Sequence, residues 1–257
     1  VAFAFANPVL INELGSSFAD ITTAEVALAG WLVLLAAVRT PSATRVVCAA
    51  LLLGGASALK LTNSVHALSA AALVLFIPGG WRSKARHTMV FAAGVAGGFA
   101  VAAAPWSLRL AQRFGNPLFP LLNGVFRSPD FTTAALRDYR FVPASPGAAL
   151  LRPFAMATSA PMVHFELPAP DLRYALLFVL VVVLLVRQAW WRVRKRRSAA
   201  DFPGQAPASR TLAALGCGFL VDWTLWLTAS GNSRYFIPMA CVAAVLSVAR
   251  GGGCHRF

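Results

Sequence analysis

Asp20 is the first residue whose type and position could serve chemistry. It closes the polar stretch Asn12–Asp20, which also contains Glu13, and a long apolar run follows it. A short polar side chain at such a place can cap a helix by accepting hydrogen bonds from free backbone N–H groups. At the mouth of a cavity the same carboxylate could act as a base or help to hold a metal ion. The sequence leaves both interpretations open, and we take Asp20 as the candidate catalytic residue.

A second polar group lies where two apolar segments meet, and it consists of Lys60, Thr62, Asn63 and His66. A single lysine at the end of a membrane span usually extends its amine to the interface. The group could also hold a phosphate or pyrophosphate head group. We therefore take Lys60 and His66 as candidate substrate-binding residues and keep the interfacial interpretation beside them.

Arg234 and Tyr235 follow the tight turn Gly231–Ser233 between the last two apolar segments. Turn-forming residues and an interfacial Arg-Tyr anchor are sufficient to explain this pattern. The planar guanidinium of arginine is also the group best suited to grip a phosphate through two hydrogen bonds. Arg234 and Tyr235 are therefore two further candidate substrate-binding residues.

Asp222 lies inside an apolar run, where a carboxylate is costly and usually faces the interior of a helix bundle. Arg234 is a partner that it could reach only through a neighbouring helix. Elsewhere the sequence has no Ser/His/Asp nucleophile spacing, no Gly-rich phosphate loop and no CxxC pair among its four cysteines. We assign no metal site and no cofactor, and leave open a divalent ion beside Asp20.

The composition defines the surroundings in which these residues must be positioned. Of the 257 residues, 58% are hydrophobic and only 12% are charged, so the chain cannot cover a water-facing surface and a lipid bilayer must solvate most of it. The net charge of +14 comes from Lys and Arg that lie between apolar runs. This placement is typical of loops that set membrane topology, and it argues against nucleic acid as a partner.

Seven apolar segments approach the length of about 20 residues that a membrane helix needs. They centre on 22–38, 44–59, 62–78, 88–107, 172–188, 211–229 and 234–250. The second and third are rich in Ala, Gly and Ser, which favours close helix packing over exposure to lipid. The expected fold class is all-α, a multi-pass transmembrane helix bundle of about seven spans.

The basic run Arg187–Arg197, with Trp190 and Trp191 as interfacial anchors, predicts a cytoplasmic loop of a multi-pass protein in the inner (plasma) membrane. Alternation then places the loops at Arg39–Arg45 and Arg82–Arg86 on the same side. The chain divides into residues 1–107 with four spans, residues 108–171 as an outward-facing interfacial segment, and residues 172–257 with three spans and the basic loop. Asp20, Lys60 and Arg234 all fall on the outward, non-cytoplasmic side.

The ends of the sequence are unusual for a membrane protein of this kind. It starts with Val1 inside an apolar stretch and finishes with the sequence GGGCHRF. We expect the chain to be an N-terminally truncated fragment of a longer protein.

Three patterns resemble the GT-C type polyprenol-phosphate-dependent membrane glycosyltransferases, which include the aminoarabinose transferases and the protein O-mannosyltransferases. They are the outward Arg234-Tyr235 pair with Pro238 three residues on, the stretch Ala19-Asp20-Ile21 before a span, and the segment Gly115–Pro129. The resemblance implies a polyprenyl-phosphate-linked sugar as the donor and transfer to an acceptor at the outer bilayer face. It also implies a first outward loop with the main catalytic carboxylate, which would lie upstream of this chain.

Under this resemblance, Arg234 and Lys60 would stabilise the departing phosphate, and Asp20 would orient the acceptor or a divalent ion. A polymerase or ligase of the O-antigen type would instead depend on the arginines of residues 108–152. A transporter would need polar groups near the midplane, for which Asp222 and the run Gly94–Gly98 are weak indications. A non-catalytic membrane subunit or an inactive fragment is the remaining alternative.

Overall fold

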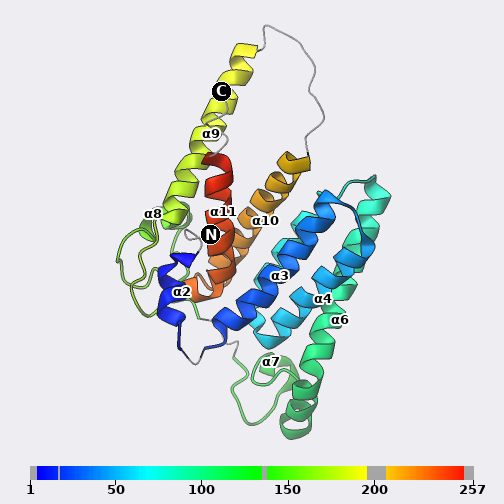
Figure 1. The fold of residues 1–257 in the computed structure, drawn as a ribbon. Helices are drawn as coiled ribbons and strands as arrows, with labels where there is room; N and C mark the ends of the chain where they lie inside the picture. The colour runs from blue at the N-terminus through cyan, green and yellow to red at the C-terminus, as the bar shows by residue number, and fades with distance from the viewer. Residues whose placement is uncertain (1–4, 17, 135–137, 196–206, 252–257) are drawn as a thin grey trace.

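The computed structural model describes residues 5–16, 18–134, 138–195 and 207–251, and within these ranges all regular structure is helical (Figure 1). Ten α-helices and two short 3₁₀ helices follow one another along these residues. They are α2 (Pro8–Glu13), α3 (Asp20–Arg39), α4 (Ala43–Leu59), η1 (Leu61–Asn63), α5 (Ser64–Val74), α6 (Trp81–Phe114), α7 (Asn123–Phe126), α8 (Pro146–Ala155), α9 (Arg173–Lys195), α10 (Pro207–Ala229), η2 (Ser233–Phe236) and α11 (Ile237–Gly251). The expected all-α fold class is confirmed.

A helix lies at each of the seven apolar segments of the sequence. Among the described residues, three helices are long and apolar enough to cross a membrane, namely α3, α6 and the part of α10 from Ser209 to Ala229. The apolar stretches Ala43–Leu59, Leu61–Val74 and Ser233–Ala249 are helical but shorter. These helices indicate a membrane protein.

Two predicted loops are helical in the structure. The basic residues Arg82–Arg86 lie in the first turns of α6, and the basic run from Arg187 continues α9 as far as Lys195. Helix α6 also continues through Pro105 to Phe114, so that its 34 residues extend over about 50 Å. That length exceeds a hydrocarbon core of about 30 Å, because Lys and Arg are good helix formers and let the helix run beyond the apolar stretch. Arg196 and Arg197 lie outside the described residues.

Helices α4 and α6 cross at close range because glycines leave no side chain between them. A Cβ atom on Gly54 would lie 2.1 Å from the carbonyl oxygen of Val95, and one on Gly98 would lie 2.4 Å from the carbonyl oxygen of Leu51. Small residues allow helix backbones to approach in this way. The close packing predicted from the small residues of the second segment is therefore confirmed.

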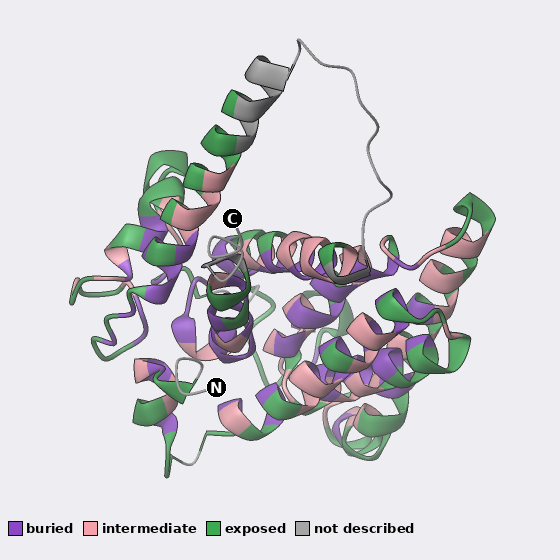
Figure 2. Cartoon of the chain, turned by 45° about the horizontal axis from the view of Figure 1, so that its top comes forward, coloured by how far each residue is buried: buried purple, intermediate pink, exposed green. Residues whose placement is uncertain are grey.

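The outer faces of the helices carry large apolar side chains. Figure 2 shows buried residues on the faces that helices turn toward one another and exposed residues on the outside. On α9 the exposed residues include Leu176, Val179, Val183 and Val186. A contiguous apolar surface of this kind is unusual in a soluble monomer and suits contact with lipid.

Aromatic rings hold η2 against α10 and α9. Trp226 of α10 stacks on Phe236 of η2 with ring centroids 4.4 Å apart, and both side chains are buried. Phe236 also contacts the ring of Tyr174 at the start of α9, with centroids 5.9 Å apart. Stacked and tilted aromatic pairs add specific geometry to the area that they bury. The position of η2 is therefore set by the core of the bundle.

Candidate functional site

Four of the five predicted site residues lie together at one end of the bundle. Asp20 is the first residue of α3, Lys60 follows the last residue of α4, and Arg234 and Tyr235 belong to η2. In Figure 1 the start of α3 and the ends of α4 and α10 lie at the same end of the bundle as α2. Alternation of the helices therefore brings these distant segments to one place.

The Asp20 carboxylate lies between two cations. Lys60 Nζ donates a hydrogen bond to Asp20 Oδ1, and Arg234 Nε lies 3.7 Å from Asp20 Oδ2. Lys60 Nζ also lies 4.9 Å from the ring centroid of Tyr235. The Asp20 side chain is only 2% exposed, so these charges interact with less screening than a surface pair would.

Two more carboxylates face Arg234. Its Nε lies 3.8 Å from Glu13 Oε1, and its Nη1 lies 3.7 Å from Glu166 Oε2. We call Glu13, Asp20, Lys60, Glu166 and Arg234 the Asp20 cluster. Glu13 belongs to the polar stretch noted in the sequence, but no signal pointed to Glu166, which reaches the cluster from the irregular segment before α9.

The Asp20 cluster contains three carboxylates and two cations, and two of its buried atoms have no hydrogen-bond partner among the described residues. These atoms are Asp20 Oδ2 and Arg234 Nε. The three contacts of Arg234 are longer than hydrogen bonds. Its guanidinium also lies over the ring of Phe18, 4.1 Å from the centroid. Arg234 is therefore held in place but not saturated, and it can accept a further ligand.

The turn before η2 is built to present Arg234. Asn232 Oδ1 accepts a hydrogen bond from the Arg234 backbone N–H over 3.0 Å, and its carbonyl oxygen accepts one from Trp226 Nε1 over 2.7 Å. Gly231 has a φ of +63°, and a Cβ there would lie 2.2 Å from the carbonyl oxygen of Phe141. Only glycine fits at that position without strain. The turn-forming residues in the sequence are thus explained by the local geometry.

The irregular segment before α9 is hydrogen-bonded to the turn at residues 231–233. Arg152 Nη2 donates to the carbonyl oxygens of Val163 and of Gly231, the latter over 2.9 Å. The Ser233 backbone N–H donates to the carbonyl oxygen of His164 over 2.7 Å. Burial lowers the pKa of Arg152 to about 10 and lowers the pKa of His164 below its ordinary value. These bonds bring Glu166 within reach of Arg234.

His66 is not part of the Asp20 cluster. Its side chain lies inside the bundle, where Nδ1 is 2.9 Å from Asp222 Oδ2 and Nε2 is 2.9 Å from the carbonyl oxygen of Tyr235. Asp222 therefore pairs with His66 rather than with Arg234, the partner considered from the sequence. Asn63 also turns away from Lys60, because its Nδ2 donates to the carbonyl oxygen of Ala56 and closes the end of α4.

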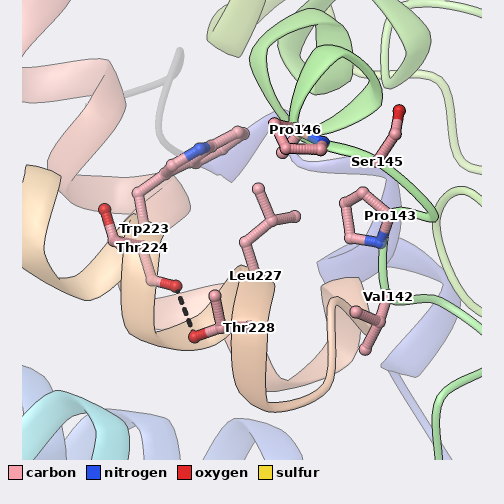
Figure 3. Close-up of a pocket in the computed structure, with 9 residues that line it drawn as sticks. Val142, Pro143, Ser145, Pro146, Trp223, Thr224, Leu227 and Thr228 are labelled. Carbon is pink, nitrogen blue, oxygen red and sulfur yellow. Dashed lines mark hydrogen bonds between the residues drawn. The ribbon is translucent and has the colours of Figure 1, made fainter.

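An apolar cavity of about 390 Å³ lies beside α10 (Figure 3). It is lined by Val142, Pro143, Ser145, Pro146, Ala149, Trp223, Thr224, Leu227 and Thr228. The three hydroxyl groups in this lining are engaged with backbone near them in the sequence. Thr228 Oγ1 donates to the Thr224 carbonyl over 2.9 Å, Thr224 Oγ1 to the Leu220 carbonyl over 2.8 Å, and Ser145 Oγ accepts from the Ala148 N–H over 3.2 Å. The cavity therefore suits a hydrocarbon, and no member of the Asp20 cluster lines it.

Within the part of the chain that the structure describes, no three His, Cys, Asp or Glu side chains are grouped so that they could hold a metal ion. The carboxylates of the Asp20 cluster face cations instead. The fold and the site together indicate an all-α membrane protein with a partly buried charge cluster at one end of its helices. No protein family, curated protein or solved structure matches this chain.

Proposed function

We propose that this protein is a membrane glycosyltransferase that moves a sugar from a polyprenyl-phosphate donor to an acceptor on the non-cytoplasmic face. The observation that supports this function is the position of the Asp20 carboxylate between Lys60 and Arg234. These three residues come from three distant segments and meet at one end of the bundle. In the proposed protein all seven apolar helices cross the bilayer. The basic run Arg187–Arg197 is cytoplasmic, and the Asp20 cluster faces outward in the inner membrane.

Three groups of the cluster, Asp20, Lys60 and Arg234, have direct roles in the proposed reaction. Displacement of a polyprenyl phosphate from the anomeric carbon needs cations that stabilise the departing phosphate and a carboxylate that orients the acceptor hydroxyl. Lys60 and Arg234 supply the cations, and Asp20 supplies the carboxylate. Because cations face both Asp20 oxygens, this carboxylate is better suited to orient a hydroxyl than to remove its proton. The acceptor oxygen bonds to the anomeric carbon as the bond from that carbon to the phosphate oxygen breaks, and the departing phosphate takes up the hydroxyl proton.

The excess of carboxylates in the cluster limits how a phosphate can bind. Both cations are already neutralised, so the donor phosphate has to draw Arg234 away from at least one carboxylate. The contacts of Arg234 with Glu13, Asp20 and Glu166 lie at 3.7 to 3.8 Å, and exchanging them for bidentate hydrogen bonds to phosphate is favourable. The freed carboxylates can then accept hydrogen bonds from the sugar hydroxyls.

The apolar cavity beside α10 gives the donor's hydrocarbon chain a place to lie. A second apolar hollow, lined by Cys217, Leu220, Val221, Thr224 and Leu225, shares Thr224 with the first. The two hollows therefore follow α10 over Cys217–Thr228, which is about 16 Å of helix. An elongated apolar track suits a prenyl chain better than it suits a compact solute.

The test is binding and turnover by the full chain in phospholipid vesicles. We expect polyprenyl phosphate to bind and the uncharged polyprenol to bind at least tenfold more weakly, since the phosphate contacts would be lost. Arg234→Ala and Lys60→Ala should lose binding. Asp20→Asn should lose release of polyprenyl phosphate when a polyprenyl-phosphate-linked hexose is supplied together with an acceptor that carries a free hydroxyl. Arg113→Ala, on the exposed end of α6, is the matched control. Equal binding of phosphate and alcohol by the wild type would overturn the proposal.

A polymerase or ligase that uses lipid-pyrophosphate donors is a second candidate. It is favoured by one contact, because Arg140 Nη2 lies 3.2 Å from Glu166 Oε1 and so connects the arginine-rich segment to the Asp20 cluster. Loss of turnover in Arg127→Ala and Arg140→Ala, with Arg234→Ala unaffected, would select this reaction. Arg137, another arginine of residues 108–152, lies outside the described residues.

A further inference from the structure

The buried pair His66–Asp222 has no part in the chemistry proposed above, although an ionisable pair inside a membrane bundle is costly to keep. Both side chains are 0% exposed. Burial of charged or polar groups at this depth is tolerated only where their hydrogen bonds are complete, and such residues often mark function. The pair therefore calls for a role beyond packing.

The hydrogen bonds around the pair form a chain that ends at η2. His66 Nδ1 and Asp222 Oδ2 are hydrogen-bonded over 2.9 Å, and Asp222 Oδ2 also accepts from Ser69 Oγ. His66 Nε2–H donates to the carbonyl oxygen of Tyr235 over 2.9 Å, because a carbonyl can only accept. The Asp222 carboxyl on α10 thus orients the His66 imidazole on α5. The imidazole in turn holds the backbone of η2 at Tyr235.

The backbone at Tyr235 needs a donor from outside its own helix. Pro238 follows three residues later and has no N–H, so the i to i+3 pattern of η2 cannot continue through Tyr235. His66 supplies a donor at this carbonyl. The side chain of Tyr235 lies over Lys60, and its neighbour Arg234 faces Asp20. The His66 imidazole therefore holds η2, the short helix that carries both Arg234 and Tyr235.

We propose that His66 and Asp222 are positioning residues that hold Arg234 and Tyr235 in place for the donor phosphate, through the hydrogen bond from His66 Nε2 to the Tyr235 carbonyl. This inference rests on the proposed function for its ligand. Neither residue touches the donor. A shift of η2 by a fraction of a hydrogen-bond length would move the guanidinium relative to both Asp20 and the phosphate, and such displacements are costly for binding.

Two substitutions at one position separate positioning from stability. In His66→Gln the amide nitrogen takes the place of Nε2 and keeps the bond to the Tyr235 carbonyl while that to Asp222 is lost. In His66→Asn the amide nitrogen takes the place of Nδ1 and keeps only the bond to Asp222. Each variant keeps one of the two bonds, so a purely structural role predicts similar effects of both.

The readouts are the equilibrium binding of polyprenyl phosphate and hydrogen–deuterium exchange of the backbone over residues 231–239, measured in vesicles. Positioning predicts roughly tenfold weaker binding and faster exchange at residues 234–236 for His66→Asn, and near wild-type values for His66→Gln. Equal effects of the two variants on hydrogen–deuterium exchange at residues 234–236 would overturn the positioning proposal. If the wild type binds no polyprenyl phosphate, the proposed function fails, and the exchange comparison still decides the positioning role.

Discussion

Replacement of Lys60 by Met measures how strongly the ion pair with Asp20 holds the site together. The substitution keeps the length and the apolar stem of the side chain and removes its charge. It leaves the Asp20 carboxylate, 2% exposed, with Arg234 at 3.7 Å as its remaining cation. Loss of one partner from a fully buried pair costs about 3–5 kcal/mol, whereas an exposed pair contributes about 0–1 kcal/mol. Because the Lys60 side chain is 21% exposed and Arg234 remains, we expect a loss of about 2 kcal/mol.

The assay is a double-mutant cycle of Lys60→Met and Asp20→Asn, with the free energy of unfolding measured by denaturant titration in detergent micelles. Coupling between the two changes should reach about 1 kcal/mol, because each residue loses its partner in either single variant. Lys84→Met is the matched control, since Lys84 makes no ion pair with the described residues. The reasoning is refuted if Lys60→Met costs no more than Lys84→Met, or if the two single effects add to within about 0.5 kcal/mol.

Three other substitutions test the crossing of α4 and α6, the buried His164 and the cavity beside α10. Gly98→Ala should cost about 1–3 kcal/mol of unfolding free energy, because its Cβ would lie 2.4 Å from a carbonyl oxygen of α4, whereas Gly97→Ala, with nothing within 4 Å, should cost nothing. Burial holds the pKa of His164 below its ordinary 6.5, so the unfolded chain binds more protons as the pH falls below that value. The wild type should therefore lose stability between about pH 7 and pH 5, and thermal melts of His164→Gln should show a smaller loss. Ala149→Phe should occupy part of the cavity and weaken binding of polyprenyl phosphate, while Ala148→Phe on the exposed side of α8 should not.

The positions of the helices could be predicted because apolar runs and polar interruptions follow directly from the exclusion of charge from lipid. The ends of the helices are harder to predict from the sequence. The sequence predicts a loop over the basic residues Arg82–Arg86, yet these residues lie in α6. Hydropathy reports where lipid begins and not where backbone hydrogen bonding stops. The number of crossings also stays a prediction, since only α3, α6 and part of α10 reach the required length and hydropathy among the described residues.

The meeting of Asp20, Lys60 and Arg234 followed from topology alone. Each is a polar residue at the end of an apolar segment, and alternation places all three ends on one side. His66 could not be assigned in the same way. The 3₁₀ turn η1 precedes α5 and sets the rotation of that helix, which decides whether a side chain faces the end of the bundle or its interior.

Glu166 shows the physical limit of reasoning from sequence at this site. The residues between α8 and α9 have no periodic pattern, so their position is set by long-range bonds from Arg152 and Ser233 to the carbonyls of residues 163 and 164. Neither bond leaves a trace in composition or spacing. Yet those bonds place the third carboxylate 3.7 Å from Arg234, and that carboxylate changes the charge balance of the cluster from neutral to acidic. A phosphate-binding role for Arg234 therefore depends on its release from Glu166, and Glu166→Gln is the variant in which that release costs least.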